Sequence, residues 1–396
     1  MSYSSEEIRQ LIATHEAALR EPGTVLFSHA RYEIRRVLGE GGMGITCLAD
    51  EFSTANLKRP VVLKFVKDSL DRQRLTQFLN EVQLSILFNH PSLVPVYRLE
   101  TEVVRVELPE GRERREHRRH HEHLIYYAVM QYIDGWNVRQ IVGRLRHLQI
   151  LLHQDLTMYI IGRVARGLNY VHDYRDHNNL HLGLVHRDVS PENILIDRFA
   201  RIKVADFGIA RAKNRPFDDG LLRAGNLLYC SPEQLEGREL DRRSDIYNIG
   251  LLMYLLFTNT DRFAGEIGLS KPRERMRSKM AQSPLPDLQH VDPRYANICA
   301  VCLREDPGQR YQSCEDLAND VDIYFKERQK VVTNEQLEEI LDDLFSPKPT
   351  FVSRRFIPLT GSTVLQPLGF DPRWFSQPAE PMGSLRTVRL DEAEDG

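Results

Sequence analysis

The chain has 396 residues, 41% of them hydrophobic and 28% charged, a composition typical of a soluble globular protein. Its formal net charge of −3 excludes the basic excess that marks nucleic-acid-binding proteins, so no nucleic-acid partner is expected. The longest apolar run, residues 246–257, contains Asn248 and is shorter than the roughly 20 residues of a membrane span. With five scattered cysteines and no signal-like N-terminus, the chain is expected to be cytoplasmic, without a membrane span.

The first third of the chain predicts a small β-rich lobe. A capping pattern at Ser5, followed by apolar residues at helical spacing, predicts a short helix, so residues 1–29 are expected to form an N-terminal helical extension. Alternating β-branched segments follow, interrupted by one helical pattern at residues 72–88. The predicted strands span residues 32–39, 45–50, 60–66, 94–99 and 126–133. Residues 30–133 are therefore expected to form an N-lobe.

The rest of the chain predicts a larger helical lobe and a tail. The apolar spacing becomes helical, and residues 134–330 are expected to form a C-lobe. Its clearest patterns are helical at residues 156–173, 243–256 and 297–302, and β-like at 194–197 and 202–204. Thr333 caps an amphipathic helix within residues 331–346, and the Pro- and Ser-rich residues 347–396 predict a mostly disordered tail.

A glycine-rich segment lies between the first two long strands of the N-lobe. Its G-x-G-x-x-G pattern comprises Gly39, Glu40, Gly41, Gly42, Met43 and Gly44. The pattern alone is a weak signal, because dinucleotide-binding folds share it. In those folds a helix follows the glycines, whereas here the β-like residues 45–49 follow and predict a hairpin. The segment therefore indicates a flap that covers the phosphates of a nucleotide.

Two charged residues of the N-lobe predict a phosphate-binding pair. Lys64 ends an apolar strand, where its ammonium could reach the α- and β-phosphates of a nucleotide. Glu81 lies on the predicted helix and can project back toward Lys64 as its ion-pair partner. Taken singly, Lys64 would be an ordinary surface lysine and Glu81 part of a solvated helix face, so the hypothesis depends on the two together.

Three further motifs follow in the C-lobe, namely HRDVSPEN at residues 186–193, DFG at 206–208 and SPE at 231–233. Their order and spacing resemble the protein-kinase signatures, and residues 30–326 are similar to bacterial, eukaryotic-like (Hanks-type) serine/threonine kinases. The phrase around residues 182–191 most resembles myxobacterial kinases. The resemblance implies an α+β, two-lobed protein-kinase-like fold and transfer of the γ-phosphoryl group of ATP to Ser or Thr hydroxyls of protein substrates.

The chemistry of phosphoryl transfer explains these residue types, because catalysis depends on positioning and on neutralising charge. Asp188 would orient and deprotonate the hydroxyl, beside Arg187. Asn193 and Asp206 offer hard oxygen ligands for Mg²⁺ or for Mn²⁺ in its place. The resemblance also implies adenine contacts by the Gln131 carbonyl and Ile133 amide. It further implies that Met130 is the gatekeeper beside the base and that Leu195 lies below the base, as its floor. The residues above the base, its ceiling, would be Leu38, Thr46 and Val62. Each apolar residue among them is also explained as ordinary core.

Two structural markers of the family are also present. Glu233 and Arg310 match its buried ion pair. Asp245 matches the helix residue that binds the backbone of the catalytic loop, which is the segment of residues 186–193. These three residues are expected to support stability rather than chemistry. Cys299 and Cys302 form a C-x-x-C pattern, but they lie in a helical pattern and are expected in the core.

The sequence departs from the family near the reacting groups. Ser190 stands where most serine/threonine kinases have a lysine, and Asn226 stands where they have a threonine, from which it could donate to Asp188. No Ser or Thr occurs at residues 209–230. An arginine in the place of Arg187 usually pairs with a phosphate on a Ser or Thr of this segment. Asp218 or Asp219 is therefore expected to supply the anion that pairs with Arg187 instead.

These departures keep other functions open. A nucleotide-binding pseudokinase scaffold is the main alternative, and a small-molecule kinase of similar fold is a third. The Arg- and His-rich insert within residues 102–123 predicts a solvated hairpin loop; it or the tail could also bind a regulatory partner, and adventitious metal capture by its histidines is a lesser alternative.

Overall fold

The computed structural model describes residues 13–358 except 29, 42–43, 54–56, 68–70, 106–121, 208–226, 267–268, 270, 281–284 and 348–355. The described part of the N-terminal extension contains a helical segment at residues 13–18. The N-lobe elements are β1 (Val25–Phe27), β2 (Arg31–Glu40), β3 (Gly44–Phe52), β4 (Lys58–Val66), α2 (Arg72–Ile86), β5 (Val96–Arg105) and β6 (Glu122–Gln131). The strands predicted from the sequence are all present, and β5 and β6 are longer than expected.

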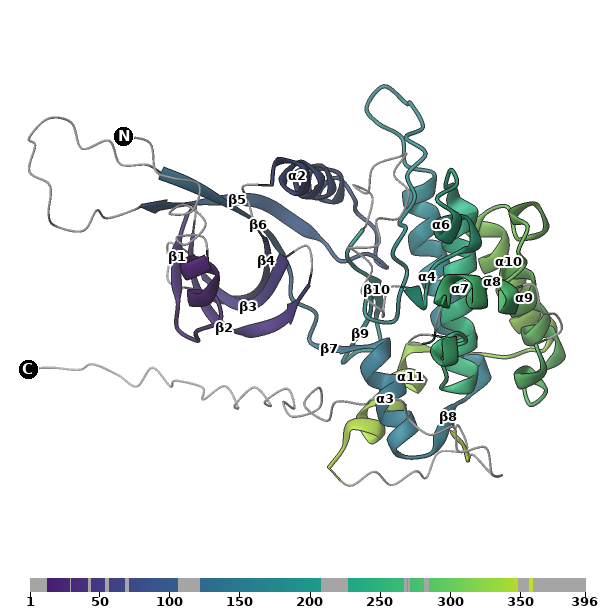
Figure 1. The fold of residues 1–396 in the computed structure, drawn as a ribbon. Coiled ribbons are helices and arrows are strands. Elements are labelled where there is room, and N and C mark those ends of the chain that lie inside the picture. Colours follow the sequence, from purple (N-terminus) through teal and green to yellow (C-terminus); the bar gives the residue numbers. More distant parts are fainter. Residues whose placement is uncertain are drawn as a thin grey trace, which may run out of the picture. The chain divides into compact units, whose positions relative to one another are not determined.

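The N-lobe is one antiparallel sheet in the order β1-β2-β3-β4-β6-β5, with α2 beside it (Figure 1). Alternation along β4 explains its two faces. Val61, Leu63 and Phe65 are buried in a cluster on one face, so the intervening Lys64 points to the other. Asp71 caps α2 by accepting from the backbone of Gln73, and the helix buries an apolar stripe.

The C-lobe is mainly helical, as expected. Its strands are β7 (Gly135–Asn137), β8 (Ile150–Leu152), β9 (Ile194–Asp197), β10 (Ile202–Val204) and β11 (Phe356–Pro358). Its α-helices are α3 (Val138–His147), α4 (Gln154–His172), α6 (Pro232–Glu236), α7 (Arg242–Thr258), α8 (Pro272–Met280), α9 (Pro293–Cys302), α10 (Cys314–Glu327) and α11 (Asn334–Phe345). Short 3-10 turns are η2 (Ala264–Glu266), η3 (Pro286–Leu288) and η4 (Pro307–Gln309). None of the helices that the structure describes is long and apolar enough to cross a membrane.

The lobes are joined by backbone hydrogen bonds as well as by the chain itself. The amide of Val94, just before β5, donates to the carbonyl of Val204 in β10, and the amide of Val204 donates to Ser92. Lys203 adds two hydrogen bonds, from Nζ to the carbonyls of Pro91 and Leu93. The N-lobe sheet is thereby fixed against the strand that immediately precedes Asp206.

Two features of the chain go beyond the sequence-based expectations. Pairing of β5 with β6 continues to Arg105 and Glu122, so a long hairpin leads into the Arg- and His-rich insert, whose residues 106–121 lie outside the described part of the chain. The strand β11, for which no sequence pattern was found, pairs antiparallel with β8 of the C-lobe. The predicted helix near Thr333 is confirmed as α11, with Thr333 as its cap.

The predicted buried ion pair of the C-lobe is present. Arg310 donates from Nη1 and Nη2 to the two carboxylate oxygens of Glu233 at 2.7 and 2.9 Å, and both residues are buried. The remaining guanidinium protons are bonded to the carbonyls of Arg243, Arg304 and Glu305. Such full satisfaction is what allows a charge pair to be buried.

Replacing Arg310 tests the importance of this pair. Arg310→Ala would leave the buried Glu233 carboxylate without its counter-charge, and we expect a loss of about 3–5 kcal/mol in the free energy of unfolding. Chemical denaturation measures this loss, with Arg304→Ala at an exposed position of the same segment as the control. A loss no larger than that of the control would contradict the structural role of the pair.

Candidate active site

The ammonium of Lys64 is the meeting point of three elements. Its Nζ donates to Glu81 Oε1 on α2 and to Asp206 Oδ1 after β10, each at 3.0 Å. The predicted pairing of Lys64 with Glu81 is therefore present. The side chains of Lys64 and Glu81 are 14% and 12% exposed, whereas that of Asp206 is 40% exposed and remains open to a further partner.

The charges around Lys64 keep it protonated. Burial alone would lower its pKa, but the carboxylates of Asp206 and Glu81 outweigh burial and raise that pKa well above the usual value. At neutral pH Lys64 therefore carries a positive charge, which an anionic phosphate can contact.

The catalytic loop is held by one buried carboxylate, as predicted. Asp245 accepts from the backbone amides of His186 and Arg187 at 2.7 and 2.8 Å, and its Oδ2 lies 2.7 Å from Nε2 of His172. Burial would raise the pKa of Asp245, but the hydrogen bond and charge of His172 outweigh burial and lower it. The carboxylate is thus a fixed anchor for the residues directly before Asp188.

Asp188 is oriented by its own loop. Its amide donates to Nδ1 of His186 at 3.2 Å. Asn193 Nδ2 donates to the backbone carbonyl of Asp188 at 2.9 Å and to its carboxylate Oδ2 at 3.3 Å. The loop therefore brings together two of the predicted site residues and fixes the direction of the Asp188 carboxylate.

The backbone of this region adopts unusual conformations. Arg187 and Asp206 both have positive φ values, of 68° and 54°, a region that L-residues rarely adopt. Phe207 is buried next to Asp206, with its ring centroid 4.7 Å from that of His186 and 5.2 Å from that of Phe88. These ring contacts hold the strained segment in place.

Asn193 and Asp206 fit the predicted magnesium site. The amide of Ala205 donates to the carbonyl of Asn193 at 2.9 Å, which brings the backbone before Asp206 against Asn193. The Asn193 amide nitrogen is bonded to Asp188, so its oxygen is the atom that could serve as a ligand. No cluster of three or more acidic, His or Cys ligands occurs in the described residues. Two oxygen ligands nevertheless suit Mg²⁺, which keeps waters and substrate phosphates as its other ligands.

The predicted adenine contacts gather between the lobes. Met130, Ala128 and Ala205 belong to one buried apolar cluster, against which Val62, Ile133 and Leu195 pack. The register explains this grouping, because Val62 lies opposite Met130 and Thr46 lies opposite Lys64. The amide of Gln131 is bonded to Pro95 at 3.0 Å. Leu38, in the predicted ceiling, is 38% exposed.

The glycine-rich segment is a hairpin between β2 and β3, as predicted. Gly39 and Glu40 lie opposite Thr46 and Ile45, and the amide of Gly41 donates to the carbonyl of Gly44 at 2.9 Å. At Gly44 a Cβ would lie 1.9 Å from the carbonyl oxygen of Phe65, so only glycine fits. Gly42 lies outside the described residues.

Glu40 has partners that the sequence did not indicate. Its carboxylate accepts from Arg20 Nη2 at 2.8 Å and from Lys67. The hydrogen bonds from Arg20 and Lys67 lower the pKa of Glu40 to about 2. The carboxylate is therefore already neutralised by this chain, and the N-terminal extension contacts the glycine-rich hairpin.

A second set of charged residues was also missed. Arg139 of α3 donates to Glu192 of the catalytic loop at 2.8 Å and to Asp261 at 2.9 Å, and the hydroxyl of Tyr229 donates to Asp261 at 2.5 Å. Burial and the nearby Asp261 raise the pKa of the Tyr229 hydroxyl, which stays protonated. The network joins the catalytic loop to Tyr229, at the end of the segment between the DFG and SPE motifs, and no spacing in the sequence predicts it.

Several predicted residues lie outside the described part of the chain. These are Asn226 beside the catalytic aspartate, Gly208 of the DFG motif, and Asp218 and Asp219 as partners of Arg187.

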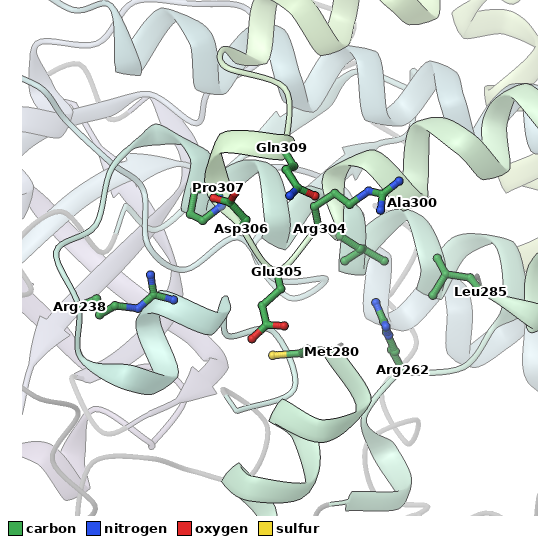
Figure 2. A pocket seen from close by; sticks show the side chains of 11 residues that line it. Arg238, Arg262, Met280, Leu285, Ala300, Arg304, Glu305, Asp306, Pro307 and Gln309 are labelled. Atoms are coloured by element: carbon green, nitrogen blue, oxygen red, sulfur yellow. The ribbon is translucent and has the colours of Figure 1, made fainter. Parts of the chain in front are cut away.

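A cavity of about 510 Å³ opens elsewhere in the C-lobe (Figure 2). Arg262, Met280, Arg304 and Glu305 are among the residues that line it. Neither the catalytic loop nor the glycine-rich hairpin contributes to this lining. This cavity is therefore separate from the residues around Lys64 and Asp188.

Comparison with known proteins agrees with this geometry. The family model described as "Protein kinase domain" matches residues 32–321. The chain belongs to this family. A crystal structure of the Mycobacterium tuberculosis PknI kinase domain is similar with a TM-score of 0.51 and 21% identity, covering 76% of this chain and 98% of that one. The two-lobed kinase fold expected from the sequence is thereby confirmed.

Curated relatives are bacterial serine/threonine-protein kinases. The probable serine/threonine-protein kinase SCO3848 of Streptomyces coelicolor is 32% identical over 301 residues, which is 74% of this chain and 39% of the relative. PknB of Mycobacterium tuberculosis is 30% identical over 299 residues, 74% of this chain and 42% of the relative. PrkC of Bacillus subtilis is 29% identical over 304 residues, 74% of this chain and 40% of the relative. The matched part of this kinase domain therefore spans about two fifths of these relatives.

The lowered pKa of Asp245 predicts how stability depends on pH. Because the carboxylate is more acidic in the folded state, its stabilisation is complete above its ordinary pKa of 3.8 and is lost as pH falls through the lowered value. We expect Asp245→Asn to lower the melting temperature at about pH 7 and to weaken its decline under acid. Thermal unfolding measured from about pH 7 down to acid pH shows both effects, with Glu239→Gln at an exposed position as the control. An unchanged acid dependence would contradict this role.

Proposed function

We propose that this protein is an ATP-dependent kinase that transfers the γ-phosphoryl group to Ser or Thr hydroxyls of proteins. The observation that carries the proposal is the position of Lys64, whose ammonium bridges Glu81 and Asp206 at 3.0 Å. A cation is thus aligned from the N-lobe onto a carboxylate of the C-lobe. Family membership and the names of the relatives support the same activity.

The residues of the site divide the work of phosphoryl transfer. ATP with Mg²⁺ supplies the phosphoryl group and the neutralising metal. Lys64 binds the α- and β-phosphates, and Glu81 holds its ammonium in place. Asn193 and Asp206 ligate the metal through oxygen. Asp188 accepts the proton of the substrate hydroxyl. Arg187 is proposed to pair with Asp218 or Asp219.

The nucleotide is proposed to lie between the glycine-rich hairpin and the C-lobe. The backbone of residues 39–44 covers its phosphates, and the side chain of Glu40 stays with Arg20 and Lys67. Gln131 and Ile133 bind the adenine edge through the backbone, next to Met130. Leu195 lies below the base, and Leu38, Thr46 and Val62 lie above it. Partial burial of Val62 and Leu195 against one apolar cluster supports this placement.

Serine and threonine are the proposed acceptors rather than tyrosine. The relatives carry serine/threonine-protein kinase in their names. Glu192 occupies the place just before Asn193 where tyrosine kinases often have a basic residue. In this structure Glu192 is paired with Arg139 at 2.8 Å.

The proposal also covers a regulatory partner, the cellular compartment and the bacterial subgroup. The insert within residues 102–123, or the tail at residues 347–396, is proposed to bind a regulatory partner. All five cysteines are free thiols, which supports a reducing compartment such as the cytoplasm. The resemblance to myxobacterial kinases is a further proposal, which depends on the phrase around residues 182–191.

The catalytic role of Asp188 is tested by Asp188→Asn. The variant keeps the size of the side chain but cannot accept the proton, so we expect kcat to fall by about 10²- to 10⁴-fold with nucleotide affinity retained. Transfer of radiolabelled phosphate to a protein substrate measures the rate, and calorimetry with a non-hydrolysable ATP analogue measures the affinity. Equal rates of wild type and variant, including no transfer by either, would favour the pseudokinase alternative.

The effect of Ser190 is tested by restoring the lysine of the family. A cation at this position would meet the developing charge on the transferred phosphoryl group, so Ser190→Lys should raise kcat by about tenfold or more. Ser190→Met, of similar length without charge, is the matched control because Ser190 is buried. A lysine variant no faster than the methionine variant would show that the site, including the proposed neighbour Asn226, has been retuned to work without that charge.

A further inference from the structure

The helix α11 lies beyond the part of the chain that matches the family, which ends at residue 321. It nevertheless belongs to the same compact unit, which extends to Pro358. Leu337, Ile340, Leu341 and Leu344 are at most 1% exposed and lie in the core cluster of the C-lobe. Figure 1 shows α11 beside α3, the helix that directly follows β7. The helix is therefore an integral part of the C-lobe.

Both ends of α11 are fixed by polar contacts. At its start, Asn334 accepts a hydrogen bond from the hydroxyl of Tyr159, and Lys330 lies 2.6 Å from Asp155. At its end, Arg144 Nε of α3 donates to the carbonyl of Leu344 at 2.9 Å. A guanidinium at a helix C-terminus satisfies a carbonyl that has no partner within the helix and interacts favourably with the helix dipole. The position of the last turn is thereby determined by α3.

The last residue of α11, Phe345, stacks on a residue of β7. This strand follows the hinge, which is the segment of residues 131–134 that joins the two lobes. The ring centroids of Phe345 and Trp136 are 4.2 Å apart with an interplanar angle of 7°. The guanidinium of Arg198 also lies over the Trp136 ring, 5.3 Å from its centroid, and Arg198 Nε donates to Asp134 at 2.9 Å. Trp136 is therefore held by an aromatic ring from α11 and by a cation from the turn after β9.

Movement of Trp136 would be transmitted to the nucleotide site. Trp136 is the middle residue of β7, where it pairs with Ile196, and the next residue, Asn137, pairs with Leu195. The strands approach so closely at Gly135 that a Cβ there would lie 2.1 Å from the carbonyl oxygen of Ile196. The pairing therefore leaves little freedom between β7 and β9. Because β9 is also paired with β10, Trp136 supports Leu195 from one side of this sheet.

We propose that Phe345 is a positioning residue for the nucleotide, which holds Trp136 and through β7 the floor residue Leu195. The inference rests on the proposed function, because Leu195 is the proposed contact with adenine. Phe345 does not touch the nucleotide itself. Its role is to fix the distance between Leu195, below the adenine, and the hinge.

The chain offers a direct spectroscopic probe of this stack. It has two tryptophans, Trp136 and Trp374, and the second lies in the tail outside the described residues. In a full-length Trp374→Phe background, the emission of Trp136 reports on its own surroundings. Phe345→Ala is the test variant and Phe345→Tyr the conservative variant that keeps the ring. Leu337→Ala, at the other end of the same helix, is the matched control for lost stability.

We expect Phe345→Ala to shift the Trp136 emission to the red and to weaken binding of a non-hydrolysable ATP analogue by about two- to tenfold. This factor is what the loss of one aromatic pair corresponds to. The KM for ATP should rise by a similar factor while kcat changes less. Phe345→Tyr should restore both emission and affinity. Leu337→Ala should lower the melting temperature and leave the emission and the affinity unchanged.

The inference is overturned if Phe345→Ala binds the analogue as tightly as the background protein, or if Leu337→Ala weakens binding equally. An unshifted emission would likewise contradict the stack. Because calorimetry requires no phosphoryl transfer, a protein that binds the analogue but transfers no phosphate would contradict the proposed activity alone. A background protein that binds no nucleotide would contradict both proposals.

Discussion

The site depends on the charge balance around Lys64, because its ammonium is correctly placed only when three separate elements are in place. The register of β4 turns Lys64 away from the apolar cluster, α2 supplies Glu81, and the segment after β10 supplies Asp206. Desolvation opposes burial of this cation, and the two carboxylates offset that cost. The three charged side chains therefore contribute little to the free energy of unfolding. Their active geometry, however, forms only when both lobes are in place.

The C-lobe gives this arrangement a rigid base. Successive residues of α7 serve two different segments, since Ser244 Oγ donates to Glu233 at 2.6 Å and Asp245 accepts from the amides of His186 and Arg187. The helix is buried along nearly its whole length, so these two polar groups are fixed in an apolar core. The catalytic loop is consequently positioned relative to the largest packed cluster of the described residues. The position of Asp188 is therefore fixed by the packing of that core.

The parts of the site that the sequence predicts are those specified by local patterns or, as for Glu233 with Arg310 and for Asp245, by the resemblance to the kinase family. Strand alternation and helical spacing are sufficient to bring Lys64 and Glu81 together, and the motif around Asp188 contains its own orienting residues, His186 and Asn193. The remaining contacts join side chains that no period relates. Arg139 and Asp261 are 122 positions apart, and only packing of α3 against the segment after α7 makes them neighbours. Outside the motifs of the family, such pairs depend on tertiary structure and leave no signal in one sequence.

The C-terminal extension shows why a family match does not define a stable unit. The match ends at residue 321, yet α11 buries four aliphatic side chains in the C-lobe core, and β11 pairs with β8. Burying one such side chain is worth about 1.5–3 kcal/mol, so the core would lose a substantial share of its stabilisation without the helix. Because that helix ends on Trp136, next to the hinge, the segment that completes the core also lies where it can affect the nucleotide site. The proposed role of Phe345 would make α11 contribute both to the core and to the position of the nucleotide site.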